Sequence, residues 1–352
     1  MNSLTRRGFA TGGLAAAGLF GLGLPARATA DVEWGIAVEG QPFREDAAYR
    51  DAIARTAELI VPMNGFKWGP MRYDRAGFDF TEAEEVVSFA EGLGLPVHGH
   101  TLLWYAYNPP WLDALTGRSE LVDVLEAHIA EVVGRYRGRV RSWDVINEVV
   151  AHDPITQGRW RDGVWRRVLG PQQVEIAFAA AHAADPAARL FINDYDLEDD
   201  TPRTRERQDA VLAIVRRLQK RNLPVHAIGM QAHLYAERTI GTANLRRFIR
   251  ELAAMGVGVA VTELDVIDWR LPKDPVTRDA LVANTARAFL DTVFDETVPE
   301  FVATWGLSDR YSWIGDTFPR LDSAKARPLP LDRDLGRKPL FDVLEEYVGA
   351  RP

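Results

Sequence analysis

Short apolar segments alternate with longer amphipathic segments from residue 31 onward, and this alternation limits the folds open to the chain. The apolar segments are rich in β-branched and aromatic residues, which predicts strands: Trp34–Val38, Leu59–Met63, Leu95–His100, Val140–Ile146, Arg189–Asn193, Val225–Met230, Val257–Thr262 and Phe301–Trp305. The intervening segments have helical spacing: Ala47–Thr56, Thr81–Gly92, Ser119–Tyr136, Val174–Ala184, Pro202–Arg221, Thr242–Met255 and Asp279–Asp295. Eight strands alternating with helices predict an α/β fold with a single (β/α)8 TIM barrel, residues 31–352.

A doubly wound parallel sheet is the alternative fold for the same alternation. Such sheets commonly bind nucleotides through a glycine-rich loop after a strand. The sequence contains no GxGxxG after a predicted strand and no phosphate-binding P-loop. The barrel is therefore favoured.

Polar or aromatic residues follow most of the predicted strands, at the point where each strand ends. They are Asn64 and Lys67, His98 and His100, Asn147 and Glu148, Asn193 and Asp194, Gln231 and His233, Glu263 and Asp265, and Trp305. The carboxyl ends of barrel strands form one face, which carries the active site in barrel enzymes. The pattern predicts one long, polar cleft at that face.

Two glutamates occupy matching places in this pattern. Glu148 follows the fourth predicted strand and Glu263 follows the seventh, so the two carboxyl groups lie across the barrel opening from one another. Hydrolysis of a glycosidic bond needs such a pair, one carboxyl to protonate the leaving oxygen and the other to attack or to guide water. The pair predicts a glycoside hydrolase.

Five motifs in chain order resemble those of glycoside hydrolase family 10, the endo-β-1,4-xylanases. They are Asp144-Val-Ile-Asn147-Glu148, Val261-Thr-Glu263-Leu-Asp265, His100-Thr-Leu-Leu-Trp104, Gly229-Met-Gln231-Ala-His233-Leu and Trp305-Gly-Leu-Ser-Asp-Arg-Tyr-Ser-Trp313. The resemblance implies a retaining mechanism, with Glu148 as general acid/base, Glu263 as nucleophile and the carboxyls about 5–5.5 Å apart. It implies no cofactor and no metal.

The resemblance also assigns supporting roles. Asn147, His233 and Asp265 would assist catalysis, with His233 and Asp265 holding Glu263 by hydrogen bonds and Asn147 bonding the sugar 2-hydroxyl. The residues expected to bind sugar are Asn64, Lys67, His100, Trp104, Tyr195, Gln231, Trp305 and Trp313. The loop from Gly306 to Asp332 is expected to fold over the cleft, whereas Trp143 is expected in the core.

The sequence departs from the family pattern on the non-reducing side of the cleft. The family usually has Glu-Asn-x-x-Lys-Trp after the second strand, and here Met63 takes the place of that glutamate. After Trp104 the family commonly has His-x-Gln, where this chain has Tyr105-Ala106-Tyr107. These changes predict an altered non-reducing-side subsite, weaker by one charge-assisted hydrogen bond of about 1.5–3 kcal/mol.

Three other functions remain open at this point. A retaining glycanase of the same clan would act on another β-glycan, and a non-catalytic derivative would only bind carbohydrate. A metal-dependent barrel hydrolase is suggested by His98-Gly99-His100, although that class places this pair on its first strand. The preferred substrate is xylan, and a monomer is expected.

The composition and the N-terminal residues limit the partners and the cellular location that we expect for the protein. The formal net charge of −8 argues against a nucleic-acid partner, and the absence of cysteine excludes disulfides and thiolate sites. Residues 1–30 contain Thr5-Arg6-Arg7-Gly8-Phe9 and a charge-free run from Gly12 to Leu24, which predicts a twin-arginine signal peptide. We expect an exported protein, periplasmic or extracellular, without a membrane association once the signal is removed.

Overall fold

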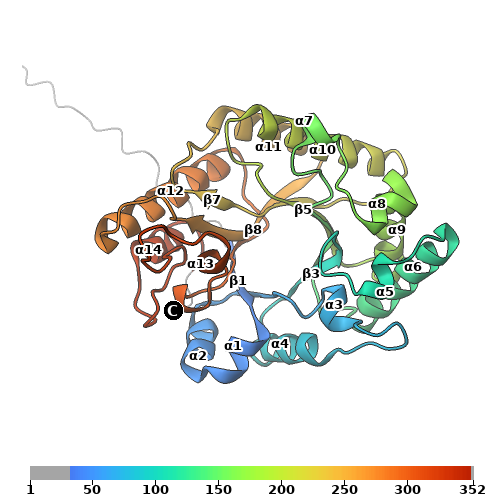
Figure 1. The fold of residues 1–352 in the computed structure, drawn as a ribbon, viewed down its shortest axis with the longest axis horizontal. Helices are drawn as coiled ribbons and strands as arrows, with labels where there is room; N and C mark the ends of the chain where they lie inside the picture. The colour runs from blue at the N-terminus through green and yellow to red at the C-terminus, as the bar shows by residue number, and fades with distance from the viewer. Residues whose placement is uncertain (1–31, 350–352) are drawn as a thin grey trace, which may run out of the picture.

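A computed structural model describes residues 32–349, so the predicted signal peptide lies outside the described residues. Nine strands lie at the centre of this part of the chain: β1 (Trp34–Val38), β2 (Leu59–Pro62), β3 (His98–Leu103), β4 (Ser142–Asn147), β5 (Arg189–Asp194), β6 (Ala227–Met230), β7 (His233–Tyr235), β8 (Gly258–Ile267) and β9 (Val302–Thr304). Figure 1 shows eight of them forming a ring viewed end on, with β7 beside β8 outside the ring.

All strand pairings in the ring are parallel. The order is β2-β1-β9-β8-β6-β5-β4-β3, and β7 pairs with the second half of β8 outside this path. An isolated parallel bridge between Ile60 and Val97 joins β2 to the start of β3, so the sheet forms a nearly closed barrel. The predicted (β/α)8 TIM barrel is confirmed.

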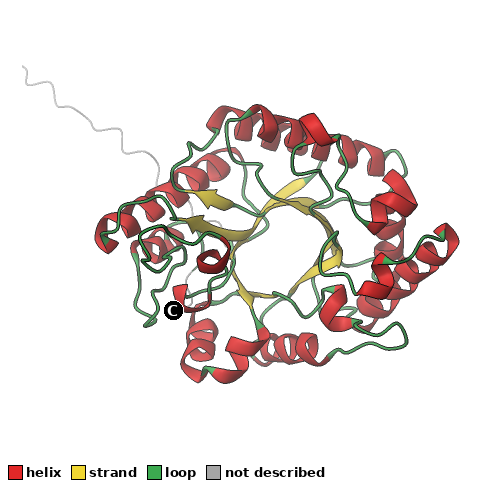
Figure 2. Ribbon diagram, viewed as in Figure 1, coloured by secondary structure: helices red, strands yellow, loops and turns green. Residues whose placement is uncertain are grey.

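Helices surround the strands, as Figure 2 shows. The long helices are α2 (Ala47–Thr56), α4 (Thr81–Gly92), α6 (Arg118–Arg135), α9 (Gln173–Ala184), α10 (Pro202–Gln219), α11 (Thr242–Ala254) and α12 (Pro275–Glu296). Shorter helices are α1 (Gly40–Glu45), α3 (Trp68–Met71), α5 (Pro110–Asp113), α7 (Pro154–Gln157), α8 (Val164–Leu169), α13 (Ile314–Thr317) and α14 (Pro339–Glu345), with 3-10 turns at Gly170–Gln172 and Asp309–Tyr311. Within residues 32–349, no helix is both long and apolar enough to span a membrane.

Alternate residues of each strand face two different apolar regions. On β1, Ile36 and Val38 belong to the large cluster that includes the helix residues, whereas Ala37 belongs to a smaller cluster inside the barrel. That inner cluster combines Phe191 and Phe301 with several alanines. Because side chains alternate with period two along a strand, one apolar run supplies both layers.

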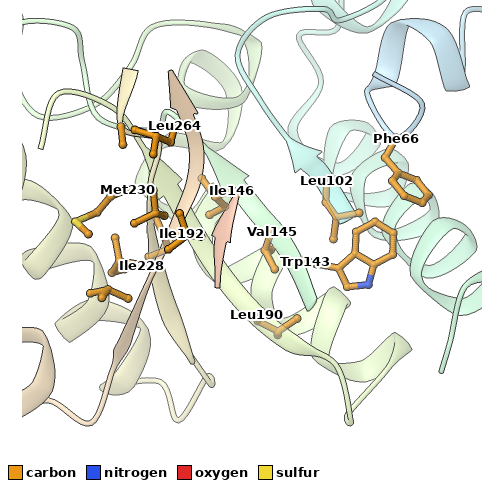
Figure 3. Packing of buried hydrophobic residues seen from close by; sticks show 14 of the residues in the cluster. Phe66, Leu102, Trp143, Val145, Ile146, Leu190, Ile192, Ile228, Met230 and Leu264 are labelled. Carbon is orange, nitrogen blue, oxygen red and sulfur yellow. The ribbon is translucent and has the colours of Figure 1, made fainter. Parts of the chain in front are cut away.

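The expectation that Trp143 is a core residue is confirmed. Its side chain is fully buried on β4 and packs edge-on against Phe66, with ring centroids 4.8 Å apart. Figure 3 shows Trp143 pointing toward Phe66 and Leu102. The indole lies directly over Gly99 on β3, because a Cβ added at Gly99 would be only 2.2 Å from Trp143 Cε3.

Some predicted boundaries were wrong. The seventh barrel strand continues to Ile267 instead of ending at Thr262, because its extension pairs with β7, a strand that the sequence analysis did not predict. The third strand runs to Leu103, beyond His100. Helix α12 begins at Pro275 instead of Asp279, since the Asp274 side chain accepts the Thr277 N–H and caps that turn.

We predict that Gly99→Ala destabilises the barrel by about 1–3 kcal/mol, because the new methyl group overlaps a buried indole with no room to move. Equilibrium urea denaturation followed by tryptophan fluorescence would measure the change. Gly134→Ala is the matched control, since a Cβ at Gly134 in α6 meets open space. Equal midpoints for Gly99→Ala and the unaltered protein would contradict this packing account.

Candidate active site

The carboxyl ends of the barrel strands open into a cleft of about 840 Å³. Every residue predicted to act or to bind sugar lines this cleft except Asp265, which is fully buried behind His233. The loop after β9 contributes Tyr311, Trp313 and Phe318 to the lining, so the expectation that it folds over the cleft is confirmed. Figure 1 shows α13 of this loop beside the barrel opening, next to β1 and β8.

Glu148 enters the cleft through a turn at the end of β4. Its φ of 55° lies in the left-handed region, which non-glycine residues seldom adopt. The Glu148 N–H still donates to the carbonyl of Asn193 on β5 at 2.9 Å, so the backbone is fixed on the neighbouring strand. Its carboxylate Oε1 accepts hydrogen bonds from Gln231 Nε2 at 3.2 Å and Asn147 Nδ2 at 3.4 Å.

The environment of Glu148 favours its protonated form. Burial raises the pKa of its carboxyl group, and the negative charges of Asp194 and Glu263 raise it further. The hydrogen bond from Gln231 acts in the opposite direction without cancelling the rise. A carboxyl held in this way can act as a general acid.

Glu263 lies on β8 in an environment that favours its ionised form. Burial alone would raise the pKa of its carboxyl group, but a hydrogen bond from His233 and the charges of His100 and His233 bring it below the ordinary value. Oε1 accepts from Asn193 Nδ2 at 2.7 Å, and Oε2 lies 3.1 Å from His233 Nε2. An ionised carboxylate with two fixed donors can act as a nucleophile.

A chain of polar groups supports Glu263 from behind. His233 Nδ1 lies 2.9 Å from Asp265 Oδ1, and Trp313 Nε1 donates to the other oxygen of Asp265 at 2.8 Å. The pairing of β7 with β8 sets His233 directly opposite Asp265. Although burial opposes its charged form, the two carboxylates raise the pKa of His233 well above its usual value, so the imidazolium donates to both.

Asn193 is a central residue of the site, and the sequence analysis named it among the strand-end residues but gave it no role in binding or catalysis. Its amide Nδ2 donates to Asn147 Oδ1 at 3.0 Å and to Glu263 Oε1, while its Oδ1 accepts from Thr262 Oγ1 at 2.7 Å. Asn193 ends the same predicted strand as Asp194 and stands in register with Asn147. The strand-end pattern indicated that Asn193 lies near the cleft, but the direction of the Asn193 side chain depended on the closed barrel.

The His98-Gly99-His100 motif serves a buried network below the cleft. His100 Nδ1 lies 2.8 Å from Asp144 Oδ2 and 3.9 Å from Glu263 Oε1, and His98 Nε2 lies 3.1 Å from Asp144 Oδ1. All three side chains are nearly inaccessible to solvent. Among residues 32–349, no group of three or more His, Asp and Glu side chains is arranged to hold a metal ion.

One side of the cleft combines a buried cation with aromatic rings. Lys67 donates to Asn64 Oδ1 at 2.9 Å, and its ammonium lies 4.9 Å from the ring centre of Trp104 and 5.7 Å from that of Trp305. Burial lowers the pKa of Lys67, whereas the charges of Glu263 and Glu148 oppose this. The group presents both hydrogen-bond donors and flat apolar faces, which suits a sugar ring.

The Tyr105-Ala106-Tyr107 segment has defined partners. Tyr107 stacks on Trp104, with ring centres 5.4 Å apart and planes inclined by 13°. The Arg161 guanidinium lies 4.5 Å from the ring centre of Tyr105, and it also hydrogen-bonds the hydroxyl of Tyr195. Both tyrosines remain exposed, so they extend the aromatic lining of the cleft.

Comparisons with known proteins agree with this geometry. The sequence profile of Glycosyl hydrolase family 10 matches residues 24–347. Endo-1,4-beta-xylanase 1 of Humicola insolens is 32% identical over 90% of this chain and 71% of its own length. Endo-1,4-beta-xylanase A of Fusarium oxysporum f. sp. lycopersici is 35% identical over 80% of this chain and 86% of its own length. The crystal structure of xylanase 10B from Thermotoga petrophila RKU-1 with xylobiose superposes with a TM-score of 0.81 at 30% identity, covering 90% of this chain and 94% of that one. The chain belongs to glycosyl hydrolase family 10.

Proposed function

We propose that the protein is a retaining endo-1,4-β-xylanase that cleaves internal β-1,4-xylosidic bonds of xylan by double displacement. The observation that carries the proposal is the opposite influence of the site on its two carboxyl groups: the pKa of Glu148 is raised and that of Glu263 is lowered. These opposite shifts provide one acid and one nucleophile in the same cleft. The names of the relatives support xylan as the substrate.

In the first step, a Glu263 oxygen attacks the anomeric carbon and the bond to the glycosidic oxygen breaks. Glu148 gives its proton to that oxygen, so the leaving sugar departs as a neutral alcohol. The glycosyl group is then held as an ester of Glu263. Asn147, beside Glu148, is expected to hydrogen-bond the sugar 2-hydroxyl as charge develops.

In the second step, water attacks the same anomeric carbon and the bond to Glu263 breaks. Glu148 is now the base that takes the water proton. Its pKa falls at this stage, because the negative charge of Glu263 is one of the causes that raise it and the ester has no such charge. Each displacement inverts the anomeric centre, so the product retains the original configuration.

Met63 makes the non-reducing side of the cleft different from the family pattern. Its half-buried thioether lines the cleft next to Asn64 and cannot accept a strong hydrogen bond from a hydroxyl. We therefore propose weaker binding at that subsite, while the two carboxyls keep the reaction type. A β-glycan other than xylan is the alternative substrate, and a protein that only binds carbohydrate is the alternative without catalysis. All residues in the proposal come from one chain, so a monomer is sufficient.

We also propose that the protein is exported through the twin-arginine pathway to the periplasm or the exterior. The support is the Arg6-Arg7 pair before a charge-free apolar run and small residues up to Ala30. A polymeric substrate outside the cell fits this location. A chain without cysteine needs no disulfide after export.

We predict that the protein hydrolyses xylan and xylo-oligosaccharides, and that Glu263→Gln lowers kcat by a factor of about 10⁴ or more because the nucleophile is lost. Reducing-sugar release and chromatography of the products, with matched cello-oligosaccharides for comparison, would measure both. Product lengths would show how Met63 affects the non-reducing side. Cleavage of another β-glycan without cleavage of xylan would overturn the substrate, and binding without any cleavage would overturn the catalytic proposal.

We predict that Asn193→Ala moves the acidic limb of the kcat/KM profile to higher pH. The lost hydrogen bond stabilises ionised Glu263, so the pKa of that carboxyl rises and the loss of activity is greatest in acid. The basic limb, which reports Glu148, is expected to move less. Asn244→Ala on α11 is the matched control away from the cleft. A uniform decrease at every pH would show that Asn193 acts only on structure.

We predict that replacing Arg6 and Arg7 by lysines keeps the xylanase activity inside the cell in a host that has twin-arginine export. Enzyme assays on the exported and cytoplasmic fractions would locate the protein. A chain starting at residue 31 provides the unexported reference. Export of the lysine variant at the normal level would rule out this signal.

A further inference from the structure

Glu39 is a cleft carboxylate to which neither the mechanism nor the family motifs assign a role. It follows β1 directly and lines the cleft together with Met63 and Lys67. The N–H of Met63 donates to the carbonyl of Val38 at 2.9 Å, so the ends of β1 and β2 lie side by side. Glu39 therefore stands next to the position where a carboxylate is missing from β2.

The Glu39 carboxylate has no protein partner that explains its position. It is half-buried, and among residues 32–349 no group donates a hydrogen bond to it or forms an ion pair with it. Burial raises the pKa of Glu39, while the charge of Lys67 acts to lower it. A half-buried carboxylate without protein donors keeps its acceptor oxygens available to water or to the hydroxyls of a ligand.

Asp46, another acid in the same region, differs from Glu39 because its carboxylate has protein partners. Asp46 accepts hydrogen bonds from Arg310 Nη1 and from the Tyr311 hydroxyl, each at 2.7 Å. Its charge is thus already compensated within the protein. Within the described residues, Glu39, unlike Asp46, keeps its carboxylate oxygens free for a substrate.

The cleft also continues beyond Glu39. A second groove of about 710 Å³ begins at Glu39 and Tyr311, which line both spaces, and runs over the start of α1 and α2 past Gln41 and Glu45. Since the two spaces share Glu39 and Tyr311, a polymer that binds in the cleft is placed to extend over these residues toward the groove. The groove leads away from the catalytic carboxyls, so it suits the distal sugars of a long chain.

We propose that Glu39 is a substrate-binding residue, which accepts hydrogen bonds from the hydroxyls of a sugar beyond the one bonded to Glu263 on the non-reducing side. Lys67 donates to the same sugar from the opposite side, and further sugars pass Tyr311 into the outer groove. Glu39 thereby supplies, from β1, an acceptor that Met63 cannot supply from β2. This inference rests on the proposed xylanase function and names a determinant of how that site binds long substrates.

The test uses nitrophenyl β-glycosides of xylose, xylobiose and xylotriose, which share one leaving group and differ only in sugars on the non-reducing side. We expect Glu39→Ala to lower kcat/KM for the xylobioside and xylotrioside on the order of tenfold more than for the xyloside, since a hydrogen bond to a charged group is lost only when the distal sugar is present. Glu39→Gln keeps one neutral acceptor, so its kcat/KM for the longer glycosides is expected to lie between those of Glu39→Ala and the unaltered enzyme. Glu126→Ala on the exposed face of α6 is the control for a generic loss of charge.

A second variant separates contact from folding. In the Glu39→Ala background, Met63→Glu is expected to restore much of the lost kcat/KM for the xylobioside and the xylotrioside. When Glu39 is present, the same Met63→Glu change is expected to raise kcat/KM less, because both carboxylates serve the same sugar. If kcat/KM of Glu39→Ala stays within twofold of that of the unaltered enzyme for all three glycosides, the inference is overturned and the xylanase proposal is left intact. If the unaltered enzyme cleaves none of these glycosides and no xylan, the proposed function itself fails.

Discussion

The site depends on a chain of side-chain amides that joins the two carboxylates. Gln231 links Glu148 to Asn147, and Asn193 links Asn147 to Glu263. An amide can donate and accept together, so each member fixes the next without adding a charge. The carboxyl groups therefore keep opposite protonation preferences while they remain in one rigid frame.

The barrel makes this arrangement possible because its strands are neighbours in space. Four strands that are adjacent in the sheet supply the amides and the nucleophile: Asn147, Asn193 and Gln231 come from the ends of β4, β5 and β6, and Glu263 comes from the middle of β8. Left-handed turns at Glu148 and Ala232 then bring successive residues to the cleft. Strain at such positions is tolerated where surrounding hydrogen bonds hold the backbone, as the Glu148 N–H does on β5.

The two ends of the cleft differ in charge and contacts. At one end, the hydroxyl of Tyr195 forms hydrogen bonds with Arg161 and His152, so polar groups fix the orientation of its ring. Near Glu39 the wall offers a carboxylate without a hydrogen-bond donor in the described part of the chain, a buried lysine and exposed aromatic rings. A substrate that is polar at its edges and apolar on its ring faces is suited to this second surface.

The sequence by itself determined the barrel, the place of each barrel strand to within a few residues, and the strand-end residues at the centre of the cleft. It could do so because apolar runs and the polar residues that end them are local features that period-two alternation makes visible. The tertiary structure alone decided that Asn193 connects the catalytic groups, that β7 extends the sheet beside β8, and that Glu39 stands next to Met63. These depend on strand register and on contacts between segments far apart in the chain, which no local pattern encodes.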